Sequence, residues 1–562
     1  MVHPIPYVQR YSYFQISGNI IVKNSCIKVE GYEPHSCPAL EKAFMVFEPT
    51  LHSFRYVGLH YNSETQTLYL PRGIDIHWLQ RLLNAEITVE RNMYNKFDYY
   101  GDEIKVKYLP RDDDQIEALQ FAVGRGRYTR NDAKSQLCIN LNTGKGKTYV
   151  SIGSMSILGI KSAVITYSRS VLLQWKKCIM EYTNITSREI YEISGSQAIY
   201  NLLVKDPEKI RKIKVFLVTH GTLKSYGDTK GWDMVTKLFE HLKIGIKFFD
   251  EAHTNFENMC MVDFYTNVYK TYYLTATPGR SNTAEDIIYQ FSFMSVESID
   301  LFHPDSDPHT HYIAMRYNSR PSPEIISWCK NKYGLDRNKY TNYIVTNENF
   351  QKMAIIVFNF IFCKILKRPE DQMIVYIGTN EAILKVMELL KLSFPVLAND
   401  IGIFSSLVDS KYKQEALDKK IILTTTKSAG AAIDIRNLKC TLVLAEPFKS
   451  AILAQQTLGR TRNGKTYYIE LVDRGFRYCN KYYLDKKKVF LTYAIDNKFM
   501  EFSDVMVDEE YNKVIQRSPV IKYGLLPFPP NSLKKPVVFL PKPITFSKEI
   551  AEQFDAETLY NQ

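Results

Sequence analysis

The sequence has little to offer a metal centre or a disulfide framework. Its nine cysteines are scattered, and no two of them form a CxxC pair. The closest approach to a ligand group is His303, His309 and His311, which lie among Asp and Pro residues and predict a polar loop. Structural zinc sites need closely spaced Cys and His ligands. We therefore expect no zinc, and reduced thiols as in a cytosolic protein.

Long apolar runs are also missing. A helix needs roughly 18 or more apolar residues to span a bilayer, and the apolar stretch 353–366 is shorter and contains Lys364. The N-terminus, Met-Val-His-Pro-Ile-Pro, shows no basic region followed by an apolar core. The pattern predicts neither a transmembrane segment nor a signal peptide. We therefore expect a cytoplasmic protein, in the host cytoplasm if the source is viral.

What the sequence does contain is apolar material for several cores and an excess of positive charge. Of 562 residues, 45% are hydrophobic and 23% are charged, which is typical of a soluble protein. The length suggests about three or four domains of ordinary size. The net charge of +12 favours a polyanionic partner, because Lys and Arg side chains attract phosphate over long distances.

Changes of pattern divide the chain into five parts. Residues 1–104 predict a small α+β domain. Over 105–295, and again over 346–500, short apolar runs alternate with helical segments, which is typical of a parallel sheet covered by helices. The polar residues 296–345 predict a connector, and the Pro-rich residues 501–562 an extended tail. Strands are expected at 135–141, 162–166, 214–219, 244–250, 271–275, 372–377, 401–404, 420–424, 441–445 and 466–471.

The first alternating region contains a candidate phosphate-binding loop. A strand is expected to lead into residues 142–148, Asn-Thr-Gly-Lys-Gly-Lys-Thr, and a helix to follow. Glycines let the backbone approach phosphate, and the helix N-terminus faces the anion. Leu141 stands at the usual first-glycine position. We predict that Lys147 reaches the β/γ-phosphates and that the Thr148 hydroxyl binds Mg²⁺. The nucleotide-binding set is Thr143, Gly144, Lys145, Gly146, Lys147 and Thr148.

Two carboxylates follow a later strand of the same region. The apolar run 244–249 leads into Asp250-Glu251-Ala252-His253. We predict that Asp250 holds Mg²⁺ through water and that Glu251 polarises the attacking water as a general base. His253 is expected to link the nucleotide site to the nucleic-acid side.

Hydroxyls and arginines complete the predicted chemistry. Thr275 and Thr277 end another strand, and their hydroxyls suit a relay between lobes. The second alternating region supplies Gln456-Thr-Leu-Gly-Arg460-Thr-Arg462. Positive charge from a facing domain stabilises the γ-phosphate in the transition state and makes hydrolysis depend on closure. Arg460 or Arg462 fills this role; their spacing of two leaves the choice between them open.

Together these motifs resemble those of superfamily 2 helicases of the DEAD/DEAH-box-like kind, over residues 108–495. The resemblance implies two tandem RecA-like lobes that use ATP and Mg²⁺. It implies that Gln115 reads adenine and that Gln456 takes part in coupling. Residues 424–434 look like motif V, with Gly430 and Asp434 at the nucleotide. The segment Val171 to Trp175 and the segment Asp473-Arg474-Gly475-Phe476 resemble the phage UvsW and XPB-like branch, whose N-terminal module contacts duplex DNA.

The resemblance also implies a nucleic-acid track across both lobes, where hydroxyl and amide groups grip phosphate without reading sequence. Two basic clusters add candidate contacts: the first is Arg125, Arg127 and Arg130, and the second is Lys481, Lys486, Lys487 and Lys488 with Tyr478, Tyr482 and Tyr483. Basic residues mixed with aromatic ones suit phosphate contact and base stacking. The residues on the matching motifs are Ser168, Arg169, Thr219, His220, Thr379, Asn380 and Thr426.

The leading hypothesis is a DNA-dependent ATPase that moves on or remodels branched DNA in replication, recombination or repair. A duplex translocase without strand separation shares every motif, whether it is a transcript-release factor or the motor subunit of a restriction system. A nonenzymatic clamp is disfavoured by the intact set Lys147, Asp250, Glu251 and Arg460. Single-stranded, duplex and forked DNA are the expected partners, and RNA is not excluded.

Overall fold

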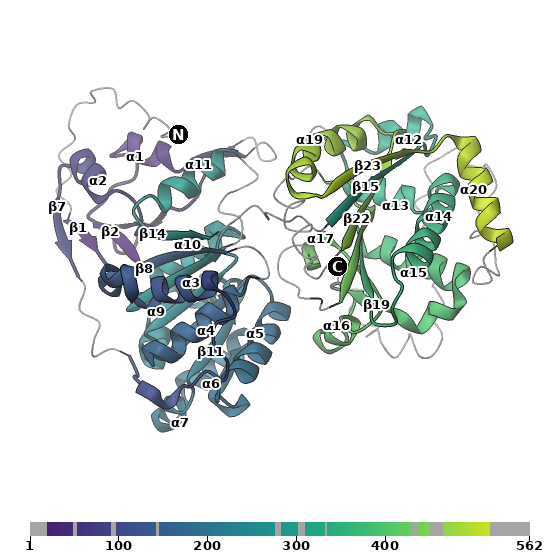
Figure 1. Cartoon of the computed structure of the whole chain (residues 1–562). Helices are drawn as coiled ribbons and strands as arrows, with labels where there is room; N and C mark the ends of the chain where they lie inside the picture. Colours follow the sequence, from purple (N-terminus) through teal and green to yellow (C-terminus); the bar gives the residue numbers. More distant parts are fainter. Residues whose placement is uncertain are drawn as a thin grey trace. The chain divides into compact units, whose positions relative to one another are not determined.

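The computed structural model divides into two compact units, and the division falls between strands β14 and β15 (Figure 1). No helix among the described residues is both long and apolar enough to cross a membrane. The structure describes residues 19–48, 53–90, 97–141, 145–275, 283–301, 310–331, 334–429, 435, 437–448 and 465–517.

The first unit begins with a small module of five-stranded sheet and two helices. Strand order is β5-β6-β2-β1-β7, with antiparallel pairs except for the parallel pair β1–β7. A separate antiparallel pair joins β3 and β4. Asp75 caps the second helix by accepting from the amides of His77 and Trp78. The elements are β1 Asn19–Val22, β2 Cys26–Glu30, α1 Pro38–Ala43, β3 Met45–Glu48, β4 Ser53–Tyr56, β5 His60–Asn62, β6 Thr67–Pro71, α2 Ile76–Leu83 and β7 Glu86–Val89.

The rest of the first unit is a lobe built on seven parallel strands in the order β10-β11-β9-β12-β13-β8-β14. The strands are β8 Gln136–Leu141, β9 Ser162–Thr166, β10 Ile190–Ile193, β11 Val215–Thr219, β12 Ile246–Asp250, β13 Lys270–Thr275 and β14 Glu297–Leu301. The helices are α3 Asp113–Val123, α4 Lys147–Leu158, α5 Arg169–Tyr182, α6 Gly195–Leu203, α7 Pro207–Arg211, α8 His220–Lys230, α9 Trp232–Leu242, α10 Phe256–Tyr265 and α11 Thr283–Ser292.

Burial on both faces explains why the central strands are near-continuous apolar runs. Every residue of β8, β12 and β13 is buried, as expected for a sheet with helices on each side. Phe249 and Tyr273 share a core with α8, α9 and α10. Phe248 and Tyr272 alternate to the other face, where the Tyr272 hydroxyl donates to the Ala122 carbonyl of α3.

A buried polar network ties the small module to the lobe. The Lys247 ammonium lies 2.5 Å from the Asp263 carboxylate and donates to Ser25 Oγ at 3.1 Å and to the Thr266 carbonyl. The Gln136 amide donates to the Ser25 carbonyl from β8. Burial lowers the pKa of Lys247 and raises the pKa of Asp263, while their mutual attraction opposes both shifts. The module is therefore part of the lobe's core and not a loosely attached appendage.

The second unit repeats the seven-stranded parallel sheet, in the order β19-β20-β18-β21-β22-β15-β23. Its strands are β15 Thr310–Tyr317, β18 Gln372–Ile377, β19 Ile401–Phe404, β20 Ile421–Thr424, β21 Leu438–Ala445, β22 Thr466–Asp473 and β23 Asp496–Glu501, and a small hairpin pairs β16 Lys330–Asn331 with β17 Gly334–Leu335. Its helices include α12 Pro323–Trp328, α13 Arg337–Ile344, α14 Glu348–Lys364, α15 Asn380–Ser393, α16 Ser410–Ala416, α17 Thr426–Ala429, α19 Arg477–Tyr493 and α20 Asp504–Arg517. The predicted α/β class with two parallel-sheet lobes is confirmed.

The predicted connector is wrong, because residues 296–345 contain strands of both sheets. β14 lies at an edge of the first sheet, where only two of its five side chains are buried. Its alternating polarity therefore resembles a loop more than a covered strand. β15 is an eight-residue strand inside the second sheet. The start of the predicted extended tail is instead helical, since α20 packs along α14. The prolines from Pro527 onward lie outside the described residues.

The buried pair gives a stability prediction. Lys247→Met leaves the Asp263 carboxylate buried without its cation, which should lower the free energy of unfolding by about 3–5 kcal/mol. Urea unfolding followed by circular dichroism measures the change. The matched control is Lys247→Met combined with Asp263→Asn, which removes both charges and should recover part of the loss. Equal losses in the single and double variants would contradict the role given to the ion pair.

Candidate ATPase site and nucleic-acid edge

The helix that follows the predicted phosphate loop begins at Lys147. Gly146 precedes it with φ +94°, a left-handed conformation that favours glycine. No side chain caps the N-terminus of this twelve-residue helix, so its first amides remain available to an anion. The Gln115 amide donates to the Lys145 carbonyl at 3.0 Å and accepts from the Arg111 amide. Gln115 thus holds the end of the loop against α3.

Lys147 and the carboxylate of Glu251 meet at the carboxyl edge of the sheet. The Lys147 ammonium lies 3.5 Å from Glu251 Oε1 and donates to the Leu141 carbonyl at 3.4 Å. Both side chains are largely buried, at 10% and 8% exposure. Glu251 has φ +50°, a conformation that side-chain-bearing residues adopt rarely and at some cost in energy. The turn therefore holds Glu251 in a strained position beside the phosphate loop.

Asp250 lies on the last position of β12 and is held by a tryptophan. The Trp175 indole N–H donates to Asp250 Oδ2 at 2.8 Å, and both residues are buried. Burial, and next the neighbouring Glu251 carboxylate, raise the pKa of Asp250 to about 6. Trp175 and Lys147 oppose that rise because each stabilises the charged form. Two adjacent, poorly solvated carboxylates of this kind attract a divalent cation.

The predicted coupling residues of the first lobe are also brought together. His253 Nδ1 lies 3.0 Å from Thr275 Oγ1 and 3.6 Å from Glu251 Oε2. The Ala252 amide donates to the Leu274 carbonyl, which fixes the turn after β12 to the end of β13. A chain of polar contacts therefore runs from the candidate general base to the end of the next strand.

These residues fit a nucleotide with Mg²⁺. An uncapped helix N-terminus and Lys147 suit the phosphates. Asp250 and the hydroxyl of Thr148 are the oxygen ligands that Mg²⁺ prefers. The fit rests on the donor set and on the buried carboxylate pair.

The predicted nucleic-acid residues of the first lobe follow β9 and β11 at the same edge. Ser168 and Thr219 occupy the N-cap positions of α5 and α8. The exposed Arg169 pairs with Glu192 at 2.7 Å. His220 differs: its ring is 1% exposed and packs against Phe249, and burial lowers its pKa to about 4. In this conformation the side chain is shielded from solvent, and its contact with nucleic acid stays a prediction.

The corresponding residues of the second lobe follow β18 and β20. Thr379 caps α15 and donates to Asn342 Oδ1, and Asn380 donates to Ser406. The Thr426 hydroxyl and amide both donate to the buried Glu446 carboxylate. The Thr426 hydroxyl is therefore already bonded within the protein, and its predicted phosphate contact stays untested.

One of the two predicted basic clusters is smaller than expected. Lys486 is fully buried, pairs with Glu470 and lies 4.1 Å from the centre of the Phe448 ring. Tyr483 is buried as well. Helical periodicity explains the error, because residues three or four apart in α19 face the sheet while their neighbours face solvent. Lys481 and Lys487 remain exposed.

Several predicted site residues lie outside the described residues. They are Thr143 and Gly144 of the phosphate loop, Thr277, Gly430, Asp434, Gln456, Arg460 and Arg462. Their roles therefore stay predictions.

Comparison with known proteins finds relatives for part of the chain. Residues 107–280 match the family described as the type III restriction enzyme, res subunit. A putative DNA 3'-5' helicase Rad25 of Haloarcula marismortui is 27% identical over 146 residues, which are 26% of this chain and 20% of that relative. Residues 107–280 thus match a helicase family of superfamily 2, and the match does not extend over the rest of the chain. The resemblance to this family implies the use of ATP, typically with Mg²⁺. The chain matches only a fifth of the Rad25 relative's length.

Solved helicase structures are among those similar to this chain. A Dbp5 variant of S. cerevisiae bound to RNA and ADP BeF3 has a TM-score of 0.47 at 14% identity, with 72% of this chain and 92% of that chain covered. UvsW of T4 has a TM-score of 0.31 at 14% identity, with 87% and 99% covered.

Sequence reasoning missed two buried partners, one in each unit. Trp175 was noted only as part of a Leu-Gln-Trp segment, and its bond to Asp250 depends on how α5 packs beside β12. Glu446 was not singled out; it accepts from Thr426 and from Arg337 at 2.9 Å. Both contacts join segments far apart in the chain, so no local pattern announces them.

Replacement of Asp250 should separate stability from activity. The folded-state pKa of about 6 lies above the ordinary value of 3.8, so ionisation of this group destabilises the folded chain as pH rises. Asp250→Asn should therefore increase the free energy of unfolding above pH 6, by about 3 kcal/mol at most, while abolishing ATP hydrolysis. The gain should disappear below pH 4, where both states are protonated. Denaturant unfolding at pH 4, 6 and 8 measures this, and a variant less stable than the parent at pH 8 would refute it.

Proposed function

We propose that this chain is a nucleic-acid-stimulated ATPase that couples ATP hydrolysis to movement on, or remodelling of, branched DNA. The observation that carries the proposal is the grouping of Lys147, Asp250 and Glu251 at one edge of a parallel sheet. The same edge presents the N-cap residues Ser168 and Thr219. The candidate nucleotide residues and the candidate nucleic-acid residues thus lie at strand ends of the same sheet.

Each residue has a distinct task in the proposed reaction. Lys147 and the first amides of α4 bind the β- and γ-phosphates and hold them in position. Asp250 and Thr148 position the Mg²⁺ ion, which supplies charge neutralisation on the phosphates. Glu251 orients the attacking water and accepts its proton. Arg460 or Arg462 supplies the positive charge that stabilises the transferring phosphoryl group.

Two features support a nucleic acid as the regulator of this reaction. The chain's net charge of +12 attracts a polyanion. The contact between His253 and Thr275 connects the catalytic turn to the next strand end, so movement of one alters the other. Phosphate contacts by N-cap hydroxyls give grip without sequence preference, which is what a motor needs.

DNA is the proposed polymer, since the Rad25 relative is named a DNA helicase and the basic charge alone does not distinguish DNA from RNA. Translocation on duplex without strand separation uses the same residues. The experiment below therefore carries separate arms for each substrate.

The decisive test is ATP hydrolysis by the full chain without nucleic acid and with single-stranded DNA, duplex DNA, forked DNA or RNA. We expect DNA, forked DNA above all, to raise the turnover rate. Lys147→Ala should lower kcat by about a hundredfold or more, because it removes a preorganised charge from the phosphates. Lys209→Ala, a change of an exposed lysine in α7, is the matched control and should retain the parent rate.

The outcomes separate the parts of the proposal. No stimulation by any polymer would refute a nucleic-acid motor, and stimulation by RNA alone would refute the assignment to DNA. Strand displacement on forks distinguishes a helicase from a duplex translocase. Binding should weaken steeply between 50 and 200 mM salt, by about a thousandfold if six or more phosphates are contacted.

A further inference from the structure

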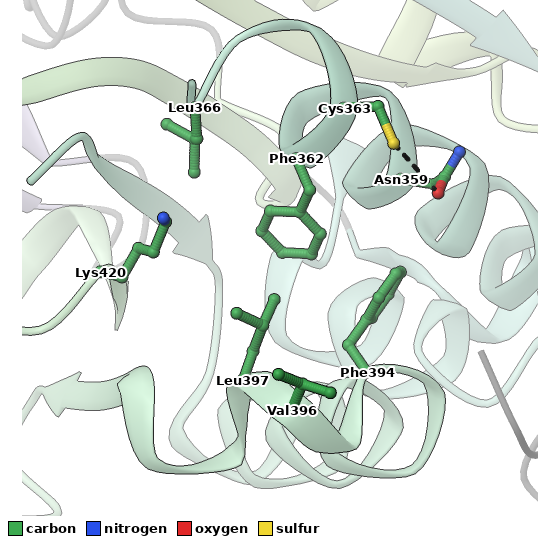
Figure 2. Close-up of a pocket in the computed structure, with 8 residues that line it drawn as sticks. All are labelled: Asn359, Phe362, Cys363, Leu366, Phe394, Val396, Leu397 and Lys420. Atoms are coloured by element: carbon green, nitrogen blue, oxygen red, sulfur yellow. Dashed lines mark hydrogen bonds between the residues drawn. The ribbon is translucent and has the colours of Figure 1, made fainter. Parts of the chain in front are cut away.

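The second unit has an apolar groove that its own described residues leave open (Figure 2). The groove has a cavity volume of about 140 Å³ and lies between the end of α14, the turn after α15 and the start of β20. Figure 2 shows the Phe362, Phe394 and Leu397 side chains directed toward its centre. The remaining lining residues are Asn359, Cys363, Leu366, Val396 and Lys420.

The groove exposes apolar surface at a cost. Val396 is 77% exposed in the part of the chain that the structure describes. The polar groups at the rim are occupied: Cys363 Sγ donates to Asn359 Oδ1, and the Lys420 ammonium donates to the Arg368 carbonyl at 3.5 Å. The open surface is therefore mainly apolar and is better suited to an apolar ligand than to a polar one.

The C-terminal segment of this chain starts beside the groove. Asn349 at the start of α14 donates to the Asn318 carbonyl, and Arg320 pairs with Asp504 at the start of α20. The first turns of both helices thus lie beside residues 318–320, and the helices run in the same direction. Val514 and Ile515, near the end of α20, pack on the same core cluster as Phe362 and Leu397. Lys352 also pairs with Asp508, so the two helices run side by side and Arg517 lies level with the last turn of α14, which lines the groove.

The chain that follows has the composition and the reach to fill the groove. Residues 536–541 read Pro-Val-Val-Phe-Leu-Pro, an apolar run flanked by lysines. The residues between Arg517 and Pro536 can span up to roughly 60 Å when extended, whereas the whole of α14 is only about 26 Å long. Because prolines restrict the conformations of the unbound run, the run loses less conformational entropy on binding, and this favours docking.

We propose that residues 536–541 bind in this groove of the same molecule and cover Phe362, Val396 and Leu397. A short tether gives the run an effective concentration of about a millimolar. Even an intrinsic dissociation constant of about 0.1 mM would then keep the groove covered about nine-tenths of the time. The tail is in this way a structural part of the second lobe, and the inference is independent of the proposed ATPase activity.

Cys363 provides the test because it lines the groove and is an exposed cysteine. The rate of its modification by a small maleimide is measured by mass spectrometry in the full chain and in a chain ending at Arg517. Deletion should raise the rate by about tenfold, the factor expected when a segment covers the thiol nine-tenths of the time. Cys178, half-buried in α5 of the first unit, is the internal reference and should react equally in both.

Point variants of the full chain guard against misfolding of the truncated one. Phe539→Asp and Val396→Asp should each raise the rate of Cys363 modification. The control variants are Asn531→Asp and Val204→Asp, and neither should change that rate. Val204 is an exposed residue of the first unit. Equal Cys363 rates in the full and shortened chains would overturn the proposal. So would protection that disappears on dilution, since a second copy and not the molecule's own tail would then be the occupant.

Discussion

The whole site depends on one constraint, which is that parallel strands end together at the same edge of their sheet. β8 and β12 are separated only by β13, so the loop after one and the turn after the other must meet. This is why the Lys147 ammonium and the Glu251 carboxylate lie 3.5 Å apart despite their distance in the sequence. The adjacent ends of β9 and β11 bring Ser168 and Thr219 to the same edge.

The carboxylates at this edge of the sheet repel each other. Asp250 and Glu251 are neighbouring buried carboxylates that face one lysine and one indole N–H. Such a cluster is unfavourable in the free protein, and a divalent cation beside the two carboxylates would offset their repulsion. The left-handed backbone at Glu251 adds conformational strain in the same turn. The buried charges of Lys247 and Asp263, in contrast, compensate each other, and this ion pair holds the N-terminal module in place.

Much of this could be predicted from sequence because the chemistry is local. Local patterns of consecutive residues include the Gly-Lys-Thr loop, the apolar strand before Asp250 and the regular recurrence of short apolar strands. The parallel-sheet fold follows from these patterns. Edge strands such as β14 escaped prediction because only one face is covered. Long-range partners escaped it as well: Trp175 for Asp250, Glu446 for Thr426 and Glu470 for Lys486 are set by packing. The burial of His220 shows that a motif position does not guarantee exposure.

The central claim is that Glu251 serves a hydrolytic site formed with Lys147 and Asp250. Single-turnover hydrolysis by Glu251→Gln tests it most directly, with nucleotide affinity measured in parallel. Loss of the general base should lower the rate constant by about a hundredfold or more, while ATP still binds in the presence of Mg²⁺ because the phosphate-binding groups remain. Hydrolysis at the parent rate with unchanged binding would contradict the account.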